Sequence, residues 1–168
     1  MNLAKLTLAC FNRARADTGT GGLLASGGLL YVDGTEAGDR LQFFFGDIDN
    51  PTTFSGFPIV IGDLGGTEEG QWSGFDLDSM TIQLEFHIFD QRRSGLANCS
   101  TIIDRLRGNW DSSTPSTAPT YGFHRHKLDL AAAGSTWGAA SFMRSGWQSA
   151  HSRDHWHFIE TYTAHMSK

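Results

Sequence analysis

The stretch "MTIQLEFHIFDQ", residues 80–91, decides the fold of this chain. Up to residue 88 its apolar residues occupy every second position: Met80, Ile82, Leu84, Phe86 and Ile88. Successive side chains of a strand point to opposite faces of the sheet, so strict alternation indicates one buried face and one open face. We therefore predict a half-buried strand here.

The flanking segments predict a hairpin before this strand and a helix after it. Upstream, "FPIVIGDL" (57–64) is a compact β-branched run, and the polar, glycine-rich stretch that follows it predicts a long β-hairpin loop. Downstream, "LANCSTIIDRLRGNWD" (96–111) repeats apolar residues at helical spacing, with Ser94 as its cap and Gly108 near its end. The predicted buried stripe of this helix is Leu96, Cys99, Ile102 or Ile103, Leu106 and Trp110.

The rest of the chain adds one more helix and further strands. A helix from Asn2 to about Asp17 is expected to bury a stripe made of Leu3, Leu6, Leu8, Cys10 and Phe11. Strands are predicted at 29–33, 40–47, 120–133 and 154–166. Residues 112–120 are expected to form an exposed Ser/Thr/Pro loop. Residues 131–153 are an irregular segment rich in aromatic residues and glycine, and its part 134–152 is interpreted as a strand or a loop.

Together these elements predict a single domain over residues 1–168. Its class is α+β: a mostly antiparallel β-sheet packed on one face by two α-helices, with a long β-hairpin loop. The length of 168 residues, 39% of them hydrophobic, is sufficient for one such core.

Composition narrows the classes of function. A formal net charge of −5 without a basic run argues against a phosphate-neutralising, sequence-specific nucleic-acid binder. No apolar run approaches the ~18 residues of a membrane span, and the N-terminus lacks a signal-peptide pattern, so we expect synthesis in a cytoplasm and no membrane partner. Cys10 and Cys99 fall on apolar helix faces, which predicts buried, reduced thiols.

Two His-x-His pairs are the candidate metal ligands. On strands, His124 with His126 and His155 with His157 would each present two imidazoles on one face, and neighbouring strands could bring all four together around Zn or Cu. The interpretation that we favour places these histidines at a solvent or subunit boundary. No nucleophile elbow or phosphate loop is present, so we predict no catalytic residue and no cofactor.

Four aromatic residues are the candidate interface residues. They lie in glycine-rich stretches too irregular for core strands: Trp72, Phe75, Trp137 and Trp147. Exposed aromatic residues are typical of surfaces that become buried on association. Packing of these side chains beneath a loop is the open alternative.

The order of the elements resembles the tail terminator (tail-completion) proteins of tailed bacteriophages. The resemblance spans about residues 3–110 and depends on "FPIVI" (57–61) and on the strand, turn and helix of 81–110. It implies a virion protein, made in the host cytoplasm, that forms a ring, usually a homohexamer, at the head-proximal end of the tail tube. Such a ring ends tube polymerisation and joins the tail to the neck while DNA passes through.

The partners implied by the resemblance are copies of the chain itself, the tail tube protein and a neck or connector protein. The resemblance supplies no catalytic residue. Three other interpretations stay open: another neck or tail-tube-associated ring protein, a His-rich metal-binding β-rich protein or enzyme, and a small-ligand-binding module.

Overall fold

A computed structural model describes most of the chain. The described residues are 3–31, 40–44, 58–69, 79–91, 95–128, 141–151 and 154–167. In chain order the elements are α1 (Leu3–Arg15), β1 (Leu41–Phe44), β2 (Ile59–Glu69), β3 (Ser79–Gln91), α2 (Gly95–Arg107), β4 (Met143–His151) and β5 (His155–Ser167).

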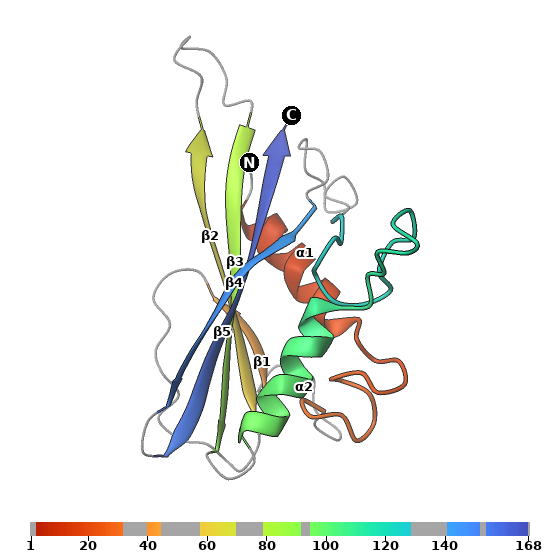
Figure 1. Cartoon of the computed structure of the whole chain (residues 1–168). Coiled ribbons are helices and arrows are strands. Elements are labelled where there is room, and N and C mark those ends of the chain that lie inside the picture. Colours follow the sequence, from red (N-terminus) through yellow and green to blue (C-terminus); the bar gives the residue numbers. More distant parts are fainter. Residues whose placement is uncertain are drawn as a thin grey trace.

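The strands form one sheet in the order β1-β2-β3-β5-β4, and both helices lie on the same side of it (Figure 1). All neighbouring strands are antiparallel except β1 and β2, which are parallel. The predicted fold class is therefore confirmed.

Strand β3 lies at the centre of the sheet and has the buried face that its alternation predicts. Ile82, Leu84, Phe86 and Ile88 are fully buried and face the helices. The hairpin of β2 and β3 is also confirmed, but β2 continues to Glu69, five residues beyond the predicted end, because β3 supplies pairing partners up to Ser79. The connection over residues 70–78 lies outside the described residues.

The helices bury narrower stripes than the sequence predicts. In α1 the buried residues include Leu6 and Cys10, while Leu8 is 54% exposed. In α2 the prediction is wrong at both ends, because Leu96 is 59% exposed and the helix stops before Trp110. Both cysteines are buried free thiols, as predicted.

Two predicted strands differ from the structure, and one segment predicted to be a strand or a loop is a strand. Over 29–31 the chain makes turns rather than a strand, and residues 32–33 are not described. Residues 121–125 also form bends and turns, and residue 126 is not in a strand, because Gly122 and Arg125 adopt positive φ angles of 77° and 62°, which an extended strand does not allow. Residues 143–151 lie in a segment interpreted as a strand or a loop, and they form β4.

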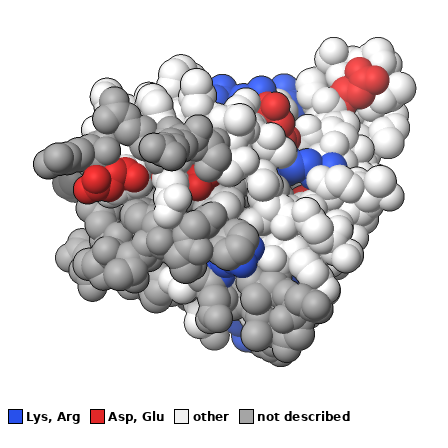
Figure 2. Space-filling view, turned by 90° about the horizontal axis from the view of Figure 1, so that it is seen from below, with Lys and Arg blue, Asp and Glu red and all other residues white. Residues whose placement is uncertain are grey.

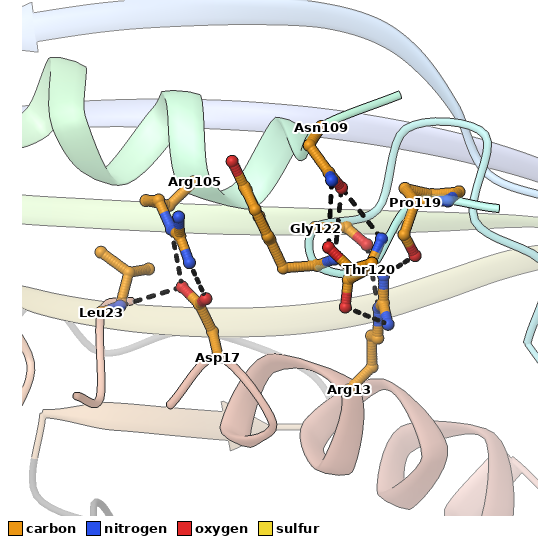
Figure 3. A network of polar contacts seen from close by, with 9 residues as sticks. Arg13, Asp17, Leu23, Arg105, Asn109, Pro119, Thr120 and Gly122 are labelled. Carbon is orange, nitrogen blue, oxygen red and sulfur yellow. Dashed lines mark hydrogen bonds and ion pairs between the residues drawn. The ribbon is translucent and has the colours of Figure 1, made fainter. Parts of the chain in front are cut away.

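A polar network ties the ends of the two helices to the chain that follows α2 (Figure 3). The Arg13 guanidinium donates to the carbonyls of Pro119, Thr120 and Gly122 at 2.9–3.1 Å. Arg105, on α2, is ion-paired with Asp17, which is buried just after the end of α1. These contacts hold the helix-covered face together near the C-terminal ends of both helices.

Candidate functional site

A groove between α2 and β4 is a candidate site for recognition. It has a volume of about 240 Å³, and α2 contributes Leu96, Ile103 and Arg107 to its wall. The strands contribute Arg144, Trp147 and Phe158. Leu96 and Trp147 remain 59% and 57% exposed, so two large apolar side chains border the groove without being covered.

A β-bulge in β4 brings two of these side chains to the same side of the sheet. Arg144 is level with Tyr162 on β5, and Trp147 is level with Glu160, with a register shift between Arg144 and Gly146. The extra residue reverses the alternation, so that both side chains face the helices. The bulge therefore creates the strand wall of the groove.

A buried ion pair supports this wall. Glu160 is fully buried and accepts hydrogen bonds from Nε of Arg144 and, at 3.0 Å, from Nη2. This two-point contact is the strong, directional form of a guanidinium–carboxylate pair. The hydrogen bond to Glu160 raises the pKa of Arg144. The pair fixes β4 against β5 beneath the groove.

β4 is an edge strand of the sheet. Among the described residues it pairs only with β5, and residues 147–151 are all exposed. An exposed edge offers unpaired backbone N–H and C=O groups to another chain. The groove thus lies beside an edge that could accept a neighbour.

The candidate aromatic residues fall in two groups. Trp147 is exposed beside the groove. Trp72, Phe75 and Trp137 lie outside the described residues. Their place in a subunit interface stays a prediction.

The two His-x-His pairs occupy different settings. His124 and His126 lie in the turns after α2, where the His124 ring meets the edge of Trp110 at 5.7 Å, so the strand predicted for this pair is wrong. His155 and His157 do lie on β5, as predicted. The described part of the chain contains no group of three or more His, Cys, Asp or Glu residues placed to hold a metal ion.

A different histidine contacts His157. Nδ1 of His87, on β3, shares a hydrogen bond of 3.0 Å with Nε2 of His157, on the sheet face turned away from the helices. Phe89 stacks on His157 at 4.2 Å, and a Glu85 oxygen lies 3.4 Å from Nε2 of His87. The alternation in residues 80–91 already places His87 on this face, and that signal could have identified the pair.

We expect the folded protein to lose stability as the pH falls from about 6.5 to about 4. Burial lowers the pKa of His126 and of His157 to about 4, from the ordinary histidine value of about 6.5. In this window the unfolded chain binds protons that the folded chain does not, so stability falls with pH, by about 1 kcal/mol per histidine after screening of these partly exposed rings. Urea denaturation at pH 7 and 4.5 measures the loss. The paired variant His126→Asn/His157→Asn should show a smaller loss, and an equal loss would contradict the assignment.

The charges of the described residues are mixed on the face drawn in Figure 2. On the face drawn in Figure 2, the described Lys and Arg residues lie scattered among acidic and uncharged ones rather than gathered into one patch. No described helix is long and apolar enough to cross a membrane.

Sequence reasoning missed Leu96, Arg144 and Glu160 as parts of the site. Glu160 carried a usable signal, because its position between Phe158 and Tyr162 is inward-facing in an alternating strand. A carboxylate at such a position requires a buried partner. The sequence alone did not identify this partner as Arg144, because the pairing depends on the register between β4 and β5.

Comparison with known proteins does not assign the chain. No protein-family model matches the sequence, and a search of curated proteins finds no significant match.

Proposed function

We propose that the protein is a structural virion component that forms a ring at the head-proximal end of a phage tail tube. In this role it ends tube polymerisation and joins the tail to the neck, and the genome passes through its lumen. Support comes from the resemblance in sequence and from the observed order of elements, in which helix α1, hairpin β2–β3, helix α2 and late strands follow one another.

The observation that carries the proposal is the uncovered surface at the β4 edge. Trp147 and Leu96 border a groove beside a strand that has a free edge. A ring needs head-to-tail contacts, in which one surface of each copy meets a different surface of the next. The β4 side of the molecule supplies one such surface, while the opposite end of the sheet is formed by β1.

Scattered charge suits a ring through which DNA moves. A clustered cationic lumen would retain a polyanion by releasing its counterions. The net charge of −5 and the mixed surface in Figure 2 favour passage over retention.

Electron microscopy of the purified protein tests the proposal directly. Negative-stain images are expected to show annuli with six-fold symmetry, and addition of the protein to polymerising tail tube should stop elongation. A monomer at all concentrations, or stoichiometric Zn or Cu lost on His155→Ala, would contradict the proposal, and the second result would favour the metal-binding alternative.

Trp147→Ala is expected to weaken ring assembly. Truncation of a buried interface tryptophan typically costs about 2 kcal/mol or more, so the concentration for half-assembly should rise about 30-fold. The matched control is Gln148→Ala, because Gln148 is the next exposed residue of the same strand and is level with Ile159, whose side chain lies on the other face. Sedimentation velocity over a dilution series measures both. Equal effects of the two substitutions would remove Trp147 from the interface.

A further inference from the structure

The start of β4 is held to the turns after α2 by hydrogen bonds. The N–H of Arg125 donates to the carbonyl of Phe142 at 2.7 Å, and the N–H of Phe142 donates to the carbonyl of His126 at 3.0 Å. The next bond along β4 is different, because the N–H of Arg144 donates to Nδ1 of His124 at 3.2 Å. Phe142 and Arg144 are two residues apart, so their backbone groups point the same way in an extended strand. The His124 ring therefore occupies the place where a neighbouring strand would offer a carbonyl.

The hydrogen bond to Arg144 requires one protonation state of His124. A backbone N–H can only donate, so Nδ1 of His124 is the acceptor and carries no proton. The proton of the neutral ring then lies on Nε2. A protonated imidazole has a hydrogen on both nitrogens and no acceptor, so it cannot make this bond. The link between His124 and Arg144 therefore exists only while the ring is neutral.

The surroundings of His124 oppose its protonation. Burial lowers the pKa of His124, and the positive charges of Arg125 in the same turn, Arg107 on α2 and Arg144 on β4 lower it further. The acidic Glu160, on β5, binds the guanidinium of Arg144. The link is therefore intact at pH 7, and it is lost as the pH falls below the lowered pKa of the ring.

The link lies directly before the part of β4 that borders the groove. The register of β4 against β5 shifts between Arg144 and Gly146, and Trp147 follows this bulge. Among the described residues, the bond to His124 is the last one that β4 makes on the side away from β5. Without it, the bulge and Trp147 are held by β5 alone.

We propose that His124 is a pH-sensitive link, which holds the bulge of β4 in place at neutral pH and releases it when the ring is protonated. The release is local, because the backbone bonds of Phe142 and the pairing of β4 with β5 do not involve the ring. It frees the strand wall of the groove, which carries Arg144 and Trp147. The link goes beyond the proposed function and is independent of it, since a single copy contains every group involved.

Hydrogen exchange of single backbone amides, measured by NMR on the dilute protein, tests the link. The pH is lowered from 7 until the ring signal of His124 reports protonation. The protection factor of the Arg144 amide should then fall about tenfold more than that of the Phe142 amide, because only Arg144 loses a hydrogen bond. Equal falls at the two amides, or a His124 ring that stays neutral until the protein unfolds, would overturn the proposal.

Two substitutions separate the acceptor from its titration. His124→Asn keeps an oxygen near the position of Nδ1 but does not titrate, so the excess fall at Arg144 should disappear. His124→Ala removes the acceptor, so the Arg144 amide should be about tenfold less protected already at pH 7. Full protection of Arg144 in His124→Ala, or an excess fall that persists in His124→Asn, would count against the link.

The ring nitrogens of His124 give a readout that does not depend on hydrogen exchange. Their ¹⁵N chemical shifts at pH 7 should show Nε2 with a proton and Nδ1 without one, and a proton on Nδ1 would contradict the hydrogen bond to Arg144. None of these measurements requires assembly. Failure of the link therefore leaves the proposed ring standing, and a chain that forms no annuli leaves the link standing.

Discussion

Gly122→Ala is expected to lower the free energy of unfolding by about 3 kcal/mol or more. Gly122 has a φ of 77°, and a Cβ at this position would overlap backbone atoms of Gly108 and Arg107. Gly108, with a φ of 95°, lies just beyond the end of α2. A side chain on either glycine therefore has to push two backbone segments apart.

This close approach matters because it completes the C-terminal end of α2. The N–H of Phe123 donates to the carbonyl of Leu106 at 2.7 Å, and the N–H of His124 donates to the carbonyl of Arg107 at 3.0 Å. These are carbonyls that a helix end leaves without partners inside the helix. Separation of the two glycines would break both hydrogen bonds and draw the buried Phe123 out of the core.

Gly21→Ala is the matched control for Gly122→Ala. Gly21 has a similar φ of 72°, but a Cβ there would meet no atom within 4 Å. Its substitution should therefore cost only backbone strain, about 1 kcal/mol. Urea denaturation of the dilute protein compares the variants, and equal losses would show that the close approach contributes nothing.

Local patterns in the sequence predicted the elements that the sheet is built around. The alternation of residues 80–91 identified β3 and its buried face, and helical periodicity identified α2. Both patterns repeat over several turns or pleats, and both elements bury one face, so sequence and burial are tightly coupled. The hairpin was likewise predicted from local pattern, because a β-branched run (57–64) and a polar, glycine-rich stretch precede the alternating strand.

Features that depend on distant parts of the chain were not predicted. The parallel pairing of β1 with β2 joins segments across residues 45–57, and no local pattern specifies strand direction. The turns at His124 and His126 arise from the positive φ of Gly122 and Arg125, the second of which is not a glycine. The strand prediction failed there because it used residue type alone.

The groove was also predicted only in part. The glycine-rich setting of Trp147 indicated an exposed aromatic residue, and Trp147 is 57% exposed. The helical stripe placed Leu96 in the core, but α2 begins only one residue earlier, at Gly95, where a Cβ would overlap the Trp156 ring. The helix therefore packs by its backbone at this end, which leaves Leu96 outside the core.

Asp17→Ala is expected to cost about 3 kcal/mol of stability, because it leaves a cation and a backbone donor without their partner. Asp17 is only 7% exposed, and its Oδ2 accepts from the N–H of Leu23 at 2.9 Å and from Nε of Arg105 at 3.1 Å (Figure 3). The Arg105 guanidinium also lies 3.6 Å from the centre of the Tyr121 ring. One carboxylate thus fixes the turn after α1, helix α2 and the chain beyond it.

Two further variants identify the cause of this loss. Asp17→Asn keeps an oxygen for the N–H of Leu23 but removes the charge that faces Arg105, so about half of the loss should remain. Adding Arg105→Ala to Asp17→Ala should cost less than the sum of the single changes, because the second change removes the unpaired cation that the first one creates. Strictly additive losses in urea denaturation would mean that the two side chains act separately, which would remove this ion pair as a link between the turn after α1 and helix α2.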